Sequence, residues 1–348
     1  MAVLIDPAAD LTTRRRLLAS LADEAATASG DVERALDLAR DWGLRLPRPG
    51  GGATVLLWEA LATLGSVDLT VARACEPHLD ALAILAEHGS AAPEPGSTWG
   101  VYAAEGPGVR LSAASGQHGW LLEGTKPWCS LAGRVSHALV TAWAGEERGL
   151  FSVSLRQNGV ATGSDAWVAR GLPEVRSTSL TFDRVAAQPV GGPGWYLRRD
   201  GFAWGGIGVA AVWYGGAVGV ARRIQAQGRR RDPDQLHLAH VGAVDTALHA
   251  ARAALAEAAV LVDGGRVGGP EAALLAGRVR GVVARTVTVV LDRADRALGP
   301  GPLVSEPEHA ARVADLHLYV RQHHADRDDA ALGRLLGSQG HDLGGPHR

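Results

Sequence analysis

The chain has 348 residues, of which 46% are hydrophobic and 21% charged, a balance that is typical of a folded globular protein and excludes global disorder. A formal net charge of −2 supplies no broad positive field for nucleic acid, and the basic runs at residues 14–16 and 229–231 are assigned to solvated helix ends. Cys75 and Cys129 are the only cysteines, so neither a disulfide framework nor a cysteine-rich zinc site is expected, and a cytoplasmic location fits.

Residues 1–97 predict an N-terminal α-helical domain. Pro77 is expected to kink or divide the last helix of this domain, because proline lacks the backbone donor that a helix uses. The segment AAPEPGS at residues 91–97 contains two prolines and a glycine and is expected to end the helical region. The helices are expected at residues 11–26, 32–40, 54–64 and 67–87, from their composition and their apolar spacing.

Residues 98–195 predict a middle β domain, because short runs such as SHALVTAW and GLFSVSL are separated by glycine, asparagine and aspartate. Residues 196–336 predict a C-terminal helical bundle, and residues 337–348 a flexible tail. Together these segments predict an α+β multidomain fold with a C-terminal four-helix bundle. The bundle helices are expected at residues 202–227, 235–262, 270–298 and 306–336.

Residues 202–221 contain no charged side chain and are long enough to cross a bilayer. Six of these residues are glycine, and arginines flank both ends, so the segment lacks the charge asymmetry of a membrane span. We therefore expect no membrane span here. The segment predicts a buried central helix whose glycines permit close approach of a neighbouring helix.

The order of helical region, β domain and helical bundle resembles the acyl-CoA dehydrogenase family of flavoproteins. Residues 124–130, GTKPWCS, are similar to a Gly-x-Lys-x-Trp-x-Thr turn of that family, and residues 171–192 resemble its strand ending in F-x-x-V-x-V-P. Residues 58–89 and 215–223 look like its N-terminal helices and first bundle helix. The resemblance implies an FAD cofactor, an acyl-CoA or similar small-molecule substrate, and a homo-oligomer or a hetero-oligomer with a homologue.

In this resemblance Trp128, Cys129 and Ser130 form the flavin-binding turn. Trp128 lies against the isoalloxazine ring, and Ser130 replaces the threonine that hydrogen-bonds the reactive edge of the flavin. The residues alone are also compatible with Trp128 packing between sheet and bundle. Arg231 falls in the loop that reaches a neighbouring subunit's FAD in the family, where a guanidinium suits the pyrophosphate. Glu123 matches an ordinary strand position, so no catalytic role is expected for it.

The catalytic glutamate of the family is missing. The resemblance puts it within YVRQHHADRDDA, residues 319–330, where His323 falls in its place, and no acidic residue lies between Asp200 and Asp232, the other usual location. Neutral imidazole, with a pKa of about 6.5, is a competent base. In a regular helix only one of His323 and His324 can face the flavin, and Asp328 would orient His324.

Neighbouring histidines in such a helix cannot chelate one metal ion, so no metal site is expected. A solvated, charge-rich helix surface without any catalytic role is the other interpretation of this segment.

The leading hypothesis is an FAD-dependent oxidoreductase that performs α,β-dehydrogenation of an acyl-CoA thioester, with His323 as the substitute base. The missing glutamates also suggest a second hypothesis, a non-catalytic partner subunit of a hetero-oligomeric acyl-CoA dehydrogenase. The third hypothesis is a reduced-flavin-dependent monooxygenase, because monooxygenases of this fold carry a comparable His-x-x-Asp segment on the final helix. Fold-level analogy alone does not decide among the three.

Overall fold

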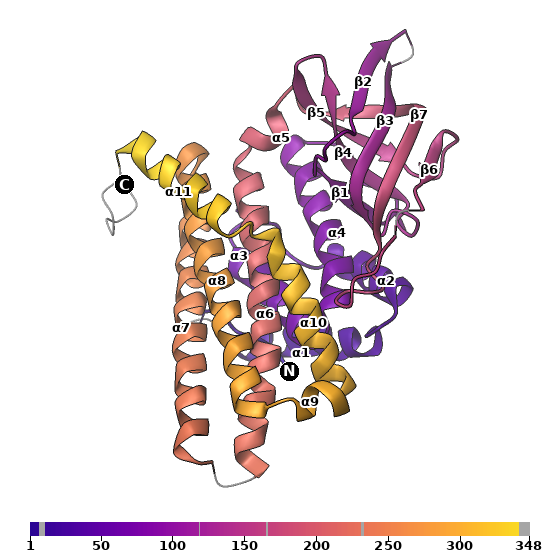
Figure 1. Ribbon diagram of the computed structural model, residues 1–348. Helices are drawn as coiled ribbons and strands as arrows, with labels where there is room; N and C mark the ends of the chain where they lie inside the picture. The colour runs from indigo at the N-terminus through magenta and orange to yellow at the C-terminus, as the bar shows by residue number, and fades with distance from the viewer. Residues whose placement is uncertain (7–10, 118, 165, 231–232, 341–348) are drawn as a thin grey trace.

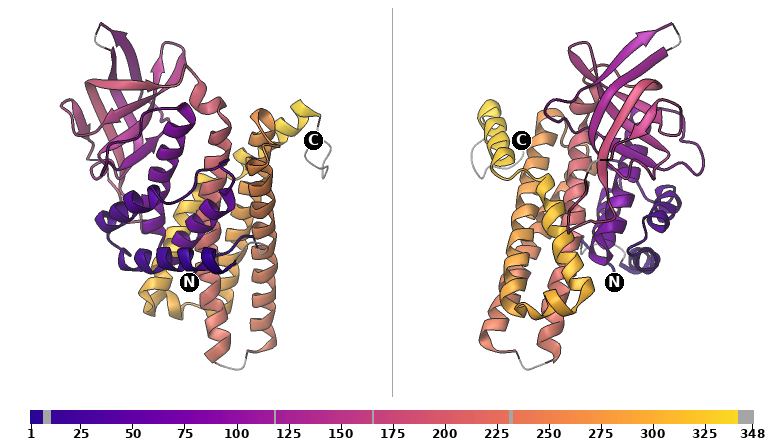
Figure 2. Two further views of the ribbon diagram at one scale, coloured as in Figure 1. Left: turned by 180° about the vertical axis from the view of Figure 1, so that it is seen from behind. Right: turned by 45° about the vertical axis from the view of Figure 1, so that its right-hand side comes forward.

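The computed structural model describes residues 1–6, 11–117, 119–164, 166–230 and 233–340. N-terminal helices are followed by a β-sheet and then by a C-terminal helical bundle (Figure 1). Seen from behind, the N-terminal helices pack against one side of the bundle, and the sheet lies beyond their end (Figure 2). The N-terminal helices are α1 (Leu11–Thr27), α2 (Val32–Gly43), α3 (Thr54–Val67) and α4 (Leu69–His88).

Helix α4 connects the helical part to the sheet and contacts β1 and α6. At the N-terminus of α4, the side chain of Asp68 accepts a hydrogen bond from the Val71 backbone. At its C-terminus, Gly89 ends the helix in the left-handed conformation, with a φ of 75°. The expectation that Pro77 divides this helix is wrong. Cys75 and His78 on either side of Pro77 are buried, and their packing holds the helix together where the proline removes one hydrogen bond.

The sheet closes on itself. Its strands are ordered β1-β4-β2-β3-β7-β5, and β5 also pairs with β4. Inward-facing residues such as Leu122, Phe151 and Phe182 belong to the main hydrophobic core. Closure satisfies the backbone groups that an open sheet edge would expose. The strands are β1 (Trp99–Tyr102), β2 (Leu111–Gly116), β3 (Gly119–Ser130), β4 (His137–Ala144), β5 (Glu147–Ser154), β6 (Val160–Thr162) and β7 (Ser177–Val190).

The bundle is built from long helices that stand side by side, with α10 running along α6 (Figure 1). The sequence predicts one continuous last helix at residues 306–336, but the structure divides this segment into α10, η1 and α11. It is broken near Ala325, whose φ of 48° is left-handed and cannot continue a right-handed helix. The elements are α5 (Trp195–Arg198), α6 (Asp200–Arg230), α7 (Gln235–Asp263), α8 (Gly269–Leu298), α9 (Gly301–Ser305), α10 (Pro307–Tyr319), the 3-10 helix η1 (Val320–Gln322) and α11 (Asp326–Gln339).

Helix α6 is the central helix of the molecule. Within the described residues it is the one helix long and apolar enough to cross a membrane, and 72% of its most apolar window is buried inside the protein. Its glycines sit against α3: a Cβ added to Gly215 would overlap the carbonyl oxygen of Ala62, and one added to Gly65 of α3 would overlap that of Val212. The burial and the close approach that the sequence predicts for this segment are both present.

We expect Gly215→Ala to lower the free energy of unfolding by about 2–3 kcal/mol, because the added methyl group has to push α3 and α6 apart. Gly242→Ala is the matched control: it is exposed on α7 with nothing near the added methyl, and should gain about 0.5–1 kcal/mol from helix propensity. Urea denaturation measures both variants. Equal effects of the two substitutions would contradict the close packing of α3 against α6.

Candidate functional site

A cavity of about 640 Å³ lies where α4, the sheet and the junction between α10 and α11 meet. Its volume falls within the range of about 300–1,000 Å³ that is usual for small-molecule sites. Leu172, Val175 and Leu318 supply apolar surface, and Trp167 supplies an aromatic ring. Polar and cationic side chains, among them Arg73, Ser130 and Arg321, also line it. The cavity therefore suits a ligand that is part aromatic and part charged.

Trp128 is presented to this cavity by a β-bulge. The register between β3 and β7 shifts between Lys126 and Cys129, and Trp128 at the bulge has a left-handed φ of 61°. Such a conformation is unfavourable for a bulky residue, and bulges near active sites re-aim side chains. The Trp128 side chain lines the cavity although the residue is 62% exposed. A large, uncovered indole face is thus available to a planar ligand.

The next two residues face in different directions. Cys129 is fully buried, its Sγ lies 3.3 Å from the carbonyl oxygen of Lys126, and burial raises the thiol pKa to about 12. It does not line the cavity. Ser130 does, and its hydroxyl accepts a hydrogen bond from Arg73 at 3.2 Å and lies 2.7 Å from the hydroxyl of Ser177. Ser130 is therefore held in a fixed orientation at the cavity wall.

The one carboxylate that lines the cavity, within the described residues, is Glu105. Lys126 is only 1% exposed and donates hydrogen bonds to Glu105 at 2.7 Å and to the Thr141 hydroxyl at 2.9 Å. Arg148 lies 3.5 Å from the same carboxylate. Partial burial opposes the shift, but Lys126 and Arg148 lower the pKa of Glu105. Its carboxylate is therefore a weak base and is unsuited to remove a proton from a substrate.

The two histidines occupy different environments, on the break between η1 and α11 and not on the regular helix that was expected. His323 is 9% exposed and does not line the cavity; its Nδ1 accepts a hydrogen bond from the Ala325 backbone at 3.2 Å, and burial lowers its pKa. His324 lines the cavity, and its Nδ1 lies 3.3 Å from Asp328. The contact between His324 and Asp328 that the spacing predicts is present, whereas the cavity receives His324 and not His323.

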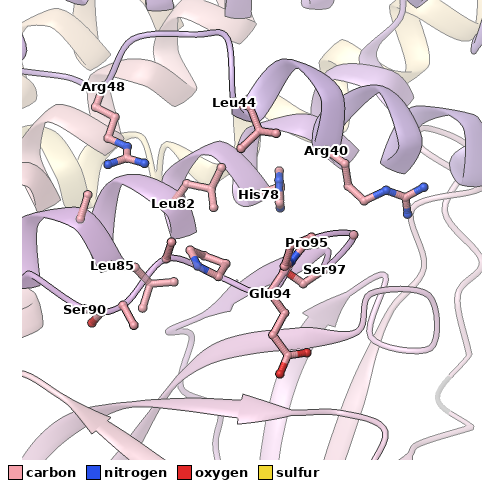
Figure 3. Close-up of a pocket in the computed structure, with 15 residues that line it drawn as sticks. Arg40, Leu44, Arg48, His78, Leu82, Leu85, Ser90, Glu94, Pro95 and Ser97 are labelled. Atoms are coloured by element: carbon pink, nitrogen blue, oxygen red, sulfur yellow. The ribbon is translucent and has the colours of Figure 1, made fainter.

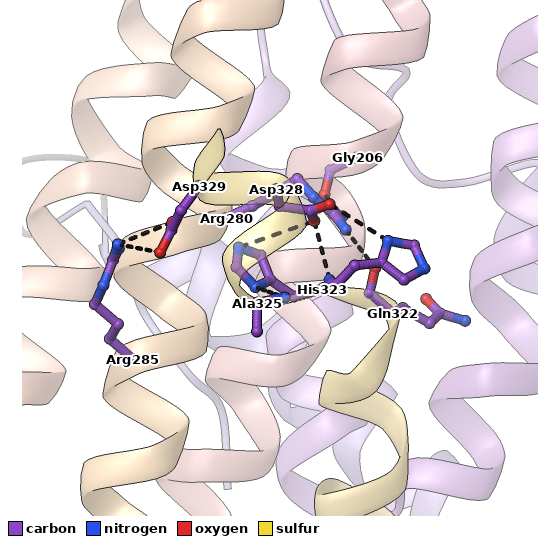
Figure 4. Close-up of polar contacts among 9 residues, drawn as sticks. Gly206, Arg280, Arg285, Gln322, His323, Ala325, Asp328 and Asp329 are labelled. Carbon is purple, nitrogen blue, oxygen red and sulfur yellow. Dashed lines mark hydrogen bonds and ion pairs between the residues drawn. The ribbon is translucent and has the colours of Figure 1, made fainter. Parts of the chain in front are cut away.

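Arg280 of α8 fixes the chain just before these histidines (Figure 4). Its guanidinium donates to the carbonyl oxygens of Gly206 on α6, at 2.9 Å, and of Gln322, at 3.0 Å. Arg285, one turn further along α8, pairs with Asp329 of α11. These contacts tie both sides of the break to the bundle, so the position of His324 depends on α6 and α8.

A buried polar cluster that was not predicted from the sequence lies beneath the cavity. Glu76 of α4 lies 3.4 Å from Arg73, and the Tyr319 hydroxyl donates to it at 3.5 Å. Burial raises the pKa of Glu76 to about 7; Arg73 opposes this shift, and the nearby carboxylate of Asp80 adds to it. Arg73, Glu76 and Asp80 recur at helical spacing within an otherwise apolar helix, and this pattern could have indicated the cluster. Arg73 and Tyr319 line the cavity, so this cluster couples Glu76 to it.

Two further arginines concern the binding of a phosphate. Arg231, the predicted pyrophosphate contact, lies outside the described residues. Arg321 lines the cavity, is exposed, and has no side-chain partner within the described part of the chain. Among those residues no group of three or more histidine, cysteine or acidic side chains could hold a metal ion.

Comparison with known proteins identifies the fold. No protein-family model matches the chain, and no curated protein matches its sequence. A structure of KijD3 with FMN and dTDP-3-amino-2,3,6-trideoxy-4-keto-3-methyl-D-glucose matches with a TM-score of 0.79 over 96% of both chains, at 17% identity. FMN-bound TdsC from Paenibacillus sp. A11-2 matches with a TM-score of 0.78 over 92% of this chain and 96% of that chain, at 18% identity.

Nitrososynthase from Micromonospora carbonacea var. africana matches with a TM-score of 0.76 over 97% of this chain and 99% of that chain, at 21% identity. At these identities the similarity establishes the fold alone. That fold is the acyl-CoA dehydrogenase-like fold that the sequence predicts.

Glu76 should make stability depend on pH. Because its folded pKa, about 7, lies above its ordinary value of 4.5, the stability it contributes is complete below pH 4.5 and is lost as pH rises through 7. We expect Glu76→Gln to remove a fall on the order of 3 kcal/mol from the free energy of unfolding between about pH 5 and about pH 8. Urea denaturation across that range measures it. Glu33→Gln, at an exposed ion pair with Arg134, is the control and should change nothing in the profile.

Trp128→Gly tests the bulge. Glycine adopts the left-handed conformation without strain, so we expect the free energy of unfolding to stay within about 1 kcal/mol of wild type. The flavin affinity that the sequence predicts for this turn should fall at least about tenfold. Arg184→Gly is the matched control, because Arg184 is also left-handed, at φ 50°, but does not line the cavity. Fluorescence titration with FMN measures the affinity. An unchanged FMN affinity in Trp128→Gly would show that FMN does not contact the Trp128 indole.

Proposed function

We propose that this protein is a reduced-flavin-dependent monooxygenase that inserts one oxygen atom into an apolar aromatic substrate. The balanced reaction consumes the substrate, one molecule of O2 and one reduced flavin, and yields hydroxylated substrate, water and oxidised flavin. FMN is the flavin we favour over FAD, because the matching structures of KijD3 and TdsC contain FMN. TdsC is described as a dibenzothiophene monooxygenase and has also been solved with FMN and indole.

The observation that carries this proposal is the chemistry of the cavity wall. An exposed indole and a fixed hydroxyl are present, whereas the one lining carboxylate, Glu105, is held by Lys126. Dehydrogenation of an acyl thioester requires a base that can remove the proton α to the carbonyl group. Oxygen insertion requires no such carboxylate. Dehydrogenation in this cavity would therefore depend on His324 as its base. We favour the monooxygenase hypothesis, because TdsC, which shares this fold, is described as a monooxygenase.

The residues that line the cavity fit a flavin. The Trp128 face would pack on the isoalloxazine ring and exclude water, and the Ser130 hydroxyl would hydrogen-bond the reactive edge, with Arg73 and Ser177 fixing its direction. Arg321 would pair with the flavin phosphate, because its guanidinium has no side-chain partner within the described residues. The bound reduced flavin would supply two electrons for the activation of oxygen.

His324 is the candidate acid-base residue. Its Nδ1 faces the carboxylate of Asp328 at 3.3 Å, an arrangement that fixes the imidazole tautomer and leaves Nε2 for proton exchange in the cavity. Asp328 also accepts a hydrogen bond from the His324 backbone at 3.2 Å, so it acts as a positioning residue. His323 lies outside the cavity lining, and we transfer the proposed role from His323 to His324.

The test supplies the full-length protein with FMN, a separate flavin reductase, NADH and isotopically heavy O2, together with indole or dibenzothiophene. We expect a hydroxylated or sulfoxidised product that carries the heavy oxygen. His324→Ala should lower the rate of product formation about 100-fold with little change in FMN affinity, because a general acid-base residue contributes about 10²–10⁴-fold. His88→Ala, an exposed histidine away from the cavity, is the control and should retain full activity.

Two other outcomes would replace the proposal. Bound flavin that an acyl-CoA thioester bleaches under anaerobic conditions would establish a dehydrogenase. Absence of flavin binding, with co-purification of a glutamate-bearing homologue, would favour the non-catalytic partner subunit. Flavin binding with no oxygen incorporation across a broad aromatic panel would also contradict the monooxygenase proposal.

A further inference from the structure

A second cavity, of about 440 Å³, lies on another side of α4. Its walls come from the C-terminal part of α2, from α4 and from residues 90–97, which lead into β1 (Figure 3). His78 lines this cavity and lies five positions along α4 from Arg73, so the two side chains project about 140° apart around the helix axis. The two cavities are therefore separate and can be altered independently.

Most of this second cavity is apolar. Leu82 and Leu85 of α4 are buried and form its inner wall, and Pro93 and Pro95 of the connecting segment face them. Leu44, at the end of α2, stands at the rim with 89% of its surface exposed (Figure 3). An apolar concavity of this volume with an uncovered leucine at its mouth suits the hydrocarbon body of a small molecule.

His78 is the polar group inside this wall. It is 3% exposed, and its Nδ1 has no hydrogen-bond partner within the described residues. Its Nε2 edge lies against α2, where a Cβ on Gly43 would be 3.0 Å away. Burial, assisted by the charge of Arg40, lowers the His78 pKa to about 4, so the imidazole is neutral near pH 7. A buried polar group without a partner destabilises the folded protein, and a ligand atom that bonds to Nδ1 would offset that cost.

Arginines set the charge of the mouth. Arg40 pairs with Asp37 on its own helix and retains further N–H donors, and Arg48 has no side-chain partner within the described residues. Among the described residues, Glu94 is the one acid in the lining, and its carboxylate is turned away from the cavity (Figure 3). The charge of Glu94 acts instead on His137. The guanidinium groups of Arg40 and Arg48 thus offer N–H donors at the mouth, and such donors suit an anion.

We propose that this second cavity binds small organic anions with an apolar body, of the class of medium-chain carboxylates. The carboxylate would accept hydrogen bonds from Arg40 and from His78 in its Nδ1-protonated tautomer, and the hydrocarbon would lie on Leu82 and Leu85. The two cavities share no lining residue, so binding at this site does not depend on the proposed monooxygenase activity.

Isothermal titration of the full-length protein with octanoate tests the proposal. We expect one saturable site per chain, no site for octylammonium, and affinity about tenfold weaker in Arg40→Gln, since an anion loses its charged partner. Arg34→Gln is the matched control: Arg34, like Arg40, is an arginine of α2 in an i,i+3 pair with an aspartate, but it is exposed and does not line the cavity. It should bind octanoate as the wild type does.

Two bulky substitutions locate the site. Ala86→Trp projects into the second cavity from a half-buried position on α4 and should abolish octanoate binding. Ala104→Trp projects into the flavin cavity from an exposed position and should leave octanoate binding intact. The proposal is overturned if no saturable binding occurs, if Arg40→Gln and Arg34→Gln bind equally, or if Ala104→Trp alone removes the binding.

Discussion

The close approach of α3 and α6 is the constraint on which the rest of the structure depends. Without side chains at Gly65 and Gly215, the two backbones pack against each other, and α6 can lie at the centre of the molecule. Asp68 ends α3 and caps α4, so the placement of α3 also sets the placement of α4. Helix α4 in turn carries Arg73 and Glu76 to the candidate flavin cavity.

The other side of that cavity also depends on α6. The carbonyl oxygen of Gly206 on α6 holds Arg280, and Arg280 holds the carbonyl oxygen of Gln322, two residues before His324. A bulge in β3 brings Trp128 from the sheet to the same space. Residues far apart in the sequence thus meet around α6, because its glycines let the neighbouring helices pack close to it. Trp128 reaches this space only in a left-handed backbone conformation, which is energetically unfavourable for a bulky residue.

The sequence predicted most elements of the fold, since proline, glycine and apolar spacing are local signals. The break after α10 escaped prediction because residues 319–330 are polar and suited to a helix, whereas the contacts that end it are long-range. Arg280, over forty positions earlier, donates a hydrogen bond to the Gln322 carbonyl oxygen. Pro77 failed as a helix breaker for a related reason, because burial around it outweighed one lost hydrogen bond.

Site prediction was limited in the same way. The resemblance pointed to Trp128 and Ser130, both of which line the cavity. The period of two in a strand could have shown that Cys129 faces the opposite side. Arg73 and Tyr319 could not be assigned to the cavity, because only the fold brings α4 and α10 together.

A crystal structure of the protein with FMN tests the central claim most directly. The account predicts the isoalloxazine ring against the Trp128 indole, the Ser130 hydroxyl within hydrogen-bond distance of the ring's reactive edge, and His324 on the substrate side of the cavity. A flavin bound elsewhere on the protein, or a ring that leaves Trp128 and Ser130 uncontacted in this cavity, would contradict it.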